Sequence, residues 1–185
     1  MRTRHAAKLA VVLSGLILHG VCSGAGPAAP VQRTGVTKSY AKGDDGEYQA
    51  GVAWPTPRFT LEGDCVTDNL TGLMWAKNAN IAGAAMSGYE AMAFCNKQEL
   101  GGHKDWRLPN TKELQSLVDF SSGVIASPFE NVPVAVYASG TIGLPVYGKL
   151  SSDYYWTMST QGYWALISPN GKRAKQLAWP VRGGK

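Results

Sequence analysis

The chain has 185 residues, of which 44% are hydrophobic and 17% are charged. This length suffices for one domain with a sizeable core and is too short for two domains of ordinary size. The formal net charge is +5, but three of the basic residues lie in an N-terminal segment that we expect to be removed, which leaves about +2 on the remainder. We therefore expect no nucleic-acid partner.

Residues 1–25 have the order of a secretory signal peptide. Arg2, Arg4 and Lys8 precede an apolar run from Leu9 to Leu18, and the small residues Ser23 to Ala25 follow. A transmembrane helix needs about 20 apolar residues, and this run has about half that number. We expect an exported protein of the periplasm, the outer surface or the extracellular medium, with no membrane span after cleavage.

Cys22 raises the alternative of a lipoprotein, in which this cysteine would become the acylated first residue. His19 stands where such a signal has an aliphatic residue, and Val21 is larger than the usual last residue. A lipid anchor through Cys22 therefore fits the sequence less well than cleavage after Ala25.

Removal of residues 1–25 leaves two cysteines, Cys65 and Cys95. An even pair in an exported protein predicts a disulfide, and closing a loop of about 30 residues is worth roughly 3.5 kcal/mol on the chain-entropy model. A zinc or redox site is a weaker reading, since His103 is the one histidine of the mature chain. We expect no cofactor and no metal ligands.

Residues 26–57 combine four prolines with glycine and small polar residues and show no sustained apolar period. This composition predicts an extended arm or linker. Its acidic stretch Asp44 to Glu47 offers carboxylates to calcium. A calcium loop needs more oxygen ligands at alternate positions, so the pattern favours a solvated acidic turn and leaves calcium binding open.

The domain proper is expected over residues 58–185. Phe59 to Leu61 and Cys65 to Thr67 alternate as strands, and Leu73 to Trp75 resumes an extended apolar run after a turn, which predicts a hairpin. Helical composition follows over residues 84–100 and places Cys95 on a helix.

The central stretch runs from Gly101 to Leu114. Its glycine pair is fit to end a helix, and Pro109 holds the preceding residue out of the α region. Asn110 is then a candidate N-cap, and Glu113 has the spacing of a capping box. A second, amphipathic helix is therefore predicted. Trp75 and Trp106 are expected in the core beneath the helices.

Residues 121–150 are rich in proline, glycine and serine and predict a long loop region with short strands. Strands are expected over residues 154–159 and 163–167. Asn170-Gly171 then predicts a tight hairpin turn. The expected last strands cover residues 174–177 and 178–182.

Several of these segments occur in an order that resembles one known family. They are Val66 to Trp75, the helix ending in Cys95, Gly101-Gly102 with Asp105-Trp106-Arg107-Leu108-Pro109, the Glu113-Leu114 helix, Tyr155-Trp156-Thr157 and Trp179 to Gly184. Residues 58–185 thus resemble the Lcl C-terminal domain family, named for the carboxy-terminal domain of the Legionella collagen-like adhesin. The resemblance implies a C-type-lectin-like α+β fold, with two helices, a twisted, mainly antiparallel sheet and long loops. It also implies surface attachment, with binding of sulfated polysaccharides in the best-known member.

The charges near the C-terminus are strongly asymmetric. No acidic residue follows Asp153, whereas Lys172, Arg173, Lys175 and Arg182 gather among several tyrosines and tryptophans. Bases can meet the anionic groups of a glycan while rings stack on its sugar faces. These four residues are our predicted ligand-binding set, and a polyanionic glycan is the expected partner. Under the alternative, the rings belong to the core and the bases form a solvated edge.

Three function classes remain: a carbohydrate-binding or adhesion module, a structural or interaction domain of the envelope, and a glycan hydrolase. A hydrolase would need a carboxylate pair at a defined separation, and Asp68, Asp105, Glu113 and Asp119 are its candidates. Asp105 is instead expected to bind backbone groups or Arg107. We expect a non-enzyme with no catalytic residue, and the sequence does not predict the oligomeric state.

Overall fold

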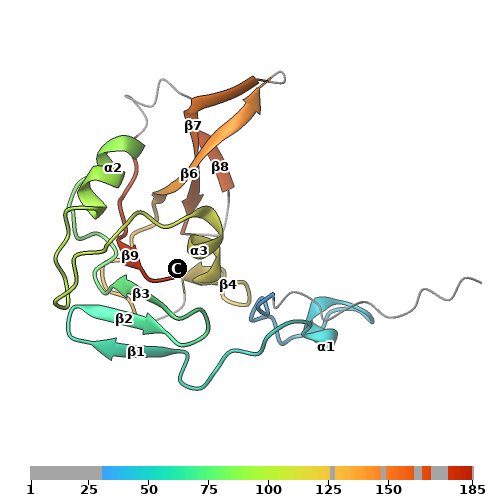
Figure 1. Cartoon of the computed structure of the whole chain (residues 1–185). Coiled ribbons are helices and arrows are strands. Elements are labelled where there is room, and N and C mark those ends of the chain that lie inside the picture. Colours follow the sequence, from blue (N-terminus) through green and yellow to red (C-terminus); the bar gives the residue numbers. More distant parts are fainter. Residues whose placement is uncertain (1–30, 126–127, 147–148, 161–163, 168–174, 185) are drawn as a thin grey trace, which may run out of the picture.

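The computed structural model describes residues 31–125, 128–146, 149–160, 164–167 and 175–184. Over these residues the chain is an α+β protein with three helices and antiparallel sheets. The elements are α1 (Asp45–Tyr48), β1 (Phe59–Glu62), β2 (Cys65–Asp68), β3 (Leu73–Ala76), α2 (Gly88–Cys95), α3 (Thr111–Ser116), β4 (Val118–Asp119), β5 (Val124–Ile125), β6 (Val136–Val146), β7 (Lys149–Ser159), β8 (Trp164–Ile167) and β9 (Val181–Arg182) (Figure 1).

The first sheet has the order β1-β2-β3-β9. Its β1–β2 hairpin is the one that strand alternation predicted, and Glu62 pairs with Cys65 across the turn. The C-terminal strand β9 joins the sheet at β3, through the pairs Met74–Arg182 and Trp75–Val181. The last described residues therefore close the sheet that the first residues of the domain begin.

A second sheet has the order β6-β7-β8, and its β6–β7 hairpin extends away from the first sheet (Figure 1). The prediction of a long loop over residues 121–150 is wrong for the second half of that range, which contains the 11-residue strand β6. Glycine and proline in β6 obscured the strand pattern. Gly140 packs closely on the central stretch, since its N–H donates to the Pro109 carbonyl at 2.7 Å and a Cβ there would lie 3.4 Å from the Leu108 carbonyl oxygen.

Both predicted helices form, but the first is shorter than expected. Ser87 caps α2 in a capping box with Glu90, so the helix begins at Gly88 and ends at Cys95 instead of spanning residues 84–100. Asn110 caps α3 as predicted, and its side chain and that of Glu113 satisfy each other's backbone N–H groups.

The main core is centred on Trp179 and includes residues of both of these sheets, of α3 and of the β4–β5 pair. The Trp179 ring packs edge-on against the rings of Trp75 and Phe129, with centroid distances of 5.5 and 4.8 Å. The centroid of the Tyr137 ring lies 5.2 Å away. The indole N–H of Trp179 donates to the Ala76 carbonyl at 2.8 Å. Trp75 and Trp106 are buried, as predicted.

Residues 31–57, expected to be an extended arm, instead fold back on the domain. The backbones of Gln32 and Val52 form a parallel bridge, which closes the segment into a loop that carries α1. The Gln32 side chain donates to the Ser116 carbonyl, and the Phe120 N–H donates to the Thr34 carbonyl. This loop, residues 31–54, thereby packs against the end of α3. The expected signal peptide and residues 26–30 lie outside the described residues.

Within the described ranges, none of the helices combines the length and apolar character that crossing a membrane requires.

Candidate functional site

The predicted ligand-binding bases are only partly described. Lys172 and Arg173 lie outside the described residues, as does the Asn170-Gly171 turn. Lys175 is exposed, and Arg182 is partly buried in β9. Each of these two bases lies beside a different element, so the structure does not bring them together.

Lys175 lies beside α2. It lines a depression of about 600 Å³ with Glu90, Phe94 and Lys97. The Glu90 carboxylate accepts the Ser87 N–H, and this bond and, more weakly, the charge of Lys175 lower the pKa of Glu90. Lys97, just beyond the end of α2, is an exposed base that our sequence prediction missed. It was missed because it lies far from Lys175 in the chain.

Arg182 binds a carboxylate. Its Nε donates to Asp105 Oδ1 at 2.7 Å, and this hydrogen bond lowers the pKa of Asp105. The prediction that Asp105 binds backbone groups or Arg107 is therefore wrong for its main contact, which is with Arg182. Arg182 is thus a base of the predicted set whose charge is already paired.

Arg107 pairs instead with Glu113 and holds the C-terminal segment in place. Its Nη1 and Nη2 lie 2.8 and 2.6 Å from the two Glu113 carboxylate oxygens, and Nη2 also donates to the Gly183 carbonyl at 2.9 Å. The pKa of Arg107 is raised by its hydrogen bond to Glu113. Trp106, its neighbour, donates its indole N–H to the carbonyls of Leu100 and His103.

The four candidate carboxylates of a hydrolase each have a structural partner. Asp105 and Glu113 bind arginines, as described above, and Asp68 binds Arg58 through two contacts of 3.3 Å. Asp119 accepts the N–H and hydroxyl of Ser121, both at 2.8 Å. That no residue is catalytic stays a prediction.

Trp179 was one of the rings placed near the predicted bases. It is fully buried, so it belongs to the core and does not offer a face to a sugar. The side chains of Tyr154, Tyr155, Tyr163 and Trp164 lie outside what the structure describes.

Cys65 and Cys95 are buried, free thiols in this structure. Cys95 packs at the end of α2 against Ala91 and Leu108, and burial raises its pKa to about 12. Burial also raises the pKa of Cys65, whose sulfur lies 2.8 Å from where a Cβ on Gly101 would be. The Cys65–Cys95 disulfide stays a prediction.

The acidic stretch Asp44 to Glu47 is a helix start. Asp44 caps α1, and its carboxylate accepts the backbone N–H groups of Tyr40, Ala41 and Glu47, which lower its pKa to about 2. Glu47 accepts the N–H of Gly43. Among the described residues, no group of three or more His, Cys, Asp or Glu side chains can hold a metal ion.

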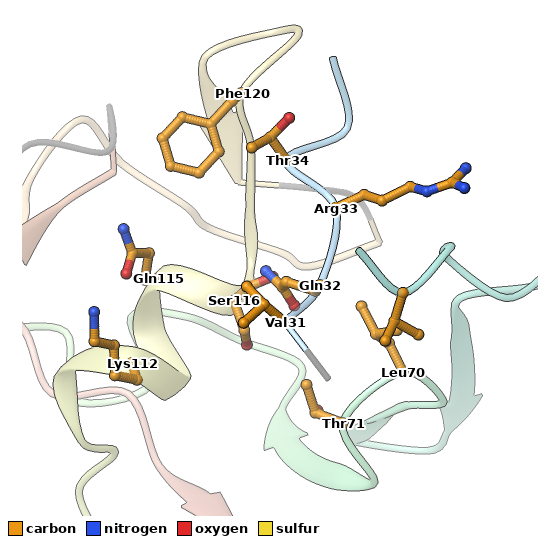
Figure 2. A pocket seen from close by; sticks show the side chains of 11 residues that line it. Val31, Gln32, Arg33, Thr34, Leu70, Thr71, Lys112, Gln115, Ser116 and Phe120 are labelled. Atoms are coloured by element: carbon orange, nitrogen blue, oxygen red, sulfur yellow. The ribbon is translucent and has the colours of Figure 1, made fainter. Parts of the chain in front are cut away.

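A groove lies between loop 31–54 and the domain (Figure 2). Its volume is about 760 Å³, within the range of about 300–1,000 Å³ that is usual for ligand sites. Loop 31–54 contributes Val31, Arg33 and Val52, and the domain contributes Leu70, Lys112 and Phe120. This groove was not predicted from the sequence, because the composition of residues 26–57 indicated a linker.

A comparison with protein families identifies the family of the domain. A family model described as the Lcl C-terminal domain matches residues 64–182, more than half of the chain. The chain belongs to the Lcl C-terminal domain family. Searches of curated proteins and of solved structures find no match.

Membership of the Lcl C-terminal domain family indicates a surface adhesion-type module. The residues that carried the resemblance have structural roles in this Lcl C-terminal domain. Arg107 and Glu113 fasten the start of α3 to Gly183, while Trp75 and Trp179 build the core. These motif residues therefore stabilise the fold.

Proposed function

We propose that this protein is an exported surface adhesion module that binds a polyanionic glycan through the basic segment from Lys172 to Arg182. Family membership supports the adhesion class. We also propose that the domain has a C-type-lectin-like fold and is not an enzyme. The α+β architecture with antiparallel sheets is compatible with that fold.

The charge distribution is the observation that carries the glycan proposal. The 32 residues after Asp153 contain five bases and no acid. Lys175 is exposed, and Lys97 brings a further base to the same depression beside α2. Several bases along one segment attract a chain of anionic groups more strongly than any of them does alone.

Arg182 is compatible with a supporting role. Its bond to Asp105 is partly exposed, with side-chain exposures of 23% and 51%. Exposed ion pairs are worth about 0–1 kcal/mol, so an anionic ligand can compete with Asp105 for the guanidinium at little cost.

A second candidate function is a non-catalytic interaction domain of the cell envelope without a glycan ligand. It is favoured by the carboxylates beside the described bases, since Glu90 lies near Lys175 and Asp105 binds Arg182. These acids reduce the local positive charge that a polyanion would meet.

A glycan array tests the proposal and separates it from this second candidate. The mature chain, from residue 26, would be probed against sulfated, carboxylated and neutral glycans. We expect signal from the sulfated and carboxylated glycans that fades as salt is raised, because exposed charges are screened over about 8 Å at physiological ionic strength. Equal signal from neutral glycans, or no signal at low salt, would favour the second candidate. Turnover of any arrayed glycan would instead indicate a hydrolase.

A further inference from the structure

The groove beneath loop 31–54 is lined by apolar side chains that remain exposed to solvent. Val31, Val52 and Phe120 line it and are 69%, 41% and 43% exposed. Leu70 adds a fourth apolar side chain from the turn between β2 and β3. Contiguous exposed apolar side chains mark an interaction site more often than isolated ones do.

The charged side chains that line the groove are both basic. They are Arg33 and Lys112, which extend toward opposite sides of the groove (Figure 2). Two carboxylates lie beside the groove without lining it: Asp45 binds the Thr34 hydroxyl, and Asp119 accepts from Ser121. The groove therefore presents an apolar centre between two separated positive charges.

Some polar groups at the groove already have hydrogen-bond partners, and others do not. The Gln32 amide donates to the Ser116 carbonyl, and the Thr34 hydroxyl binds Asp45. The Gln115 amide and the Lys112 ammonium also line the groove, with no hydrogen-bond partner in the described ranges of the chain. Both can donate to the carbonyl or carboxylate oxygens of a bound chain.

From this arrangement we infer that the groove binds an acidic peptide segment of a partner protein, in which an apolar side chain lies between two carboxylates. The apolar side chain packs among Val31, Leu70 and Phe120. One carboxylate meets Lys112 and the other meets Arg33. This site is separate from the basic C-terminal segment and does not depend on the glycan proposal.

Other occupants match the groove less well. A fatty acid carries one carboxylate and would leave one of the two bases without a partner. In an extended peptide, carboxylates four residues apart lie on one face about 13 Å from each other, and an apolar side chain midway between them lies on that same face.

Synthetic peptides provide the direct probe. Capped heptapeptides in which one leucine lies two residues from each of two glutamates, with serine at the other positions, would be titrated against the mature chain by fluorescence anisotropy. Matched sets would replace both glutamates by glutamine or the leucine by serine. We expect saturable binding by the first set only, because both the charges and the apolar contact contribute.

Variants locate the site. Arg33→Glu and Lys112→Glu should each weaken peptide binding by about tenfold or more, since like charges brought together cost several kcal/mol. Lys112→Ala and Phe120→Ser should act in the same direction. Lys42→Glu changes an exposed base outside the groove and should bind as wild type does.

Three results would overturn the inference. One is the absence of binding by any peptide of the acidic apolar set. Another is unchanged affinity in Arg33→Glu and Lys112→Glu when circular dichroism shows both variants folded. The third is competition by decanoate or heparin that displaces the peptide, which would assign the groove to a lipid or a glycan. If the Lys112→Glu variant still binds heparin, the glycan proposal holds independently of the groove.

Discussion

Replacing Arg58 by alanine is expected to destabilise the protein by about 3–5 kcal/mol, because it leaves the carboxylate of Asp68 buried without its cation. Asp68 is fully buried, and the Arg58 side chain is only 6% exposed. The guanidinium contacts both Asp68 oxygens at 3.3 Å and also donates to the Ser116 carbonyl. Urea unfolding followed by tryptophan fluorescence measures the change.

Arg58 also joins three parts of the chain. Its guanidinium lies 4.2 Å from the centre of the Trp54 ring and 4.7 Å from that of Phe59, while Ser116 ends α3. We therefore expect Arg58→Ala to expose residues 31–57 to limited proteolysis before the domain itself is cut.

The matched control is Lys104→Ala, which removes an exposed ion pair with Glu99 whose side chains are 76% and 63% exposed. Such pairs contribute about 0–1 kcal/mol. A loss below about 1 kcal/mol for Arg58→Ala, no larger than that of the control, would show that the buried pair does not hold the loop and the hairpin together.

Trp179→Ala is expected to cost about 3–5 kcal/mol, the usual range for removing a large buried aromatic side chain. The Trp179 ring contacts Trp75, Phe129 and Tyr137, and its N–H satisfies the Ala76 carbonyl. Its loss would leave a cavity where the two sheets meet. The free energy of unfolding in urea, compared with that of wild type, gives the cost.

Trp179→Phe separates packing from hydrogen bonding. It keeps most of the ring contacts and loses the bond to Ala76, so we expect a smaller cost of about 1–3 kcal/mol. If the phenylalanine variant were as unstable as the alanine variant, the hydrogen bond and not the ring packing would be the larger contribution.

Features fixed by neighbouring residues were predictable from the sequence. Asn110 and Glu113 lie three residues apart and form the capping box that their spacing predicted. The turn between β2 and β3, predicted before Leu73, was equally local. The ordered motifs identified the family, and the buried positions of Trp75 and Trp106 followed from their size.

Features that depend on distant contacts were not predictable. Strand β6 contains Gly140 and Pro145, which argue against a strand unless β7 and the central stretch are known to pack against it. The bond between Arg182 and Asp105 joins residues 77 positions apart. The loop 31–54 reads as a linker because its bonds to Ser116 and Phe120 depend on the folded end of α3.

The central claim is that the basic segment binds a polyanion, and a heparin titration by calorimetry tests it most directly. Wild type would be compared at low and high salt with the triple variant Lys172→Ala, Arg173→Ala, Lys175→Ala. The control triple variant Lys38→Ala, Lys42→Ala, Lys104→Ala removes the same charge from exposed lysines elsewhere.

We expect wild type and the control variant to bind at low salt and to lose most of that binding at high salt. The basic-segment variant should bind about tenfold or more weakly at low salt, since each lost contact to a charged group contributes about 1.5–3 kcal/mol. A folded basic-segment variant that binds as tightly as wild type, or a wild type that does not bind heparin at low salt, would contradict the account.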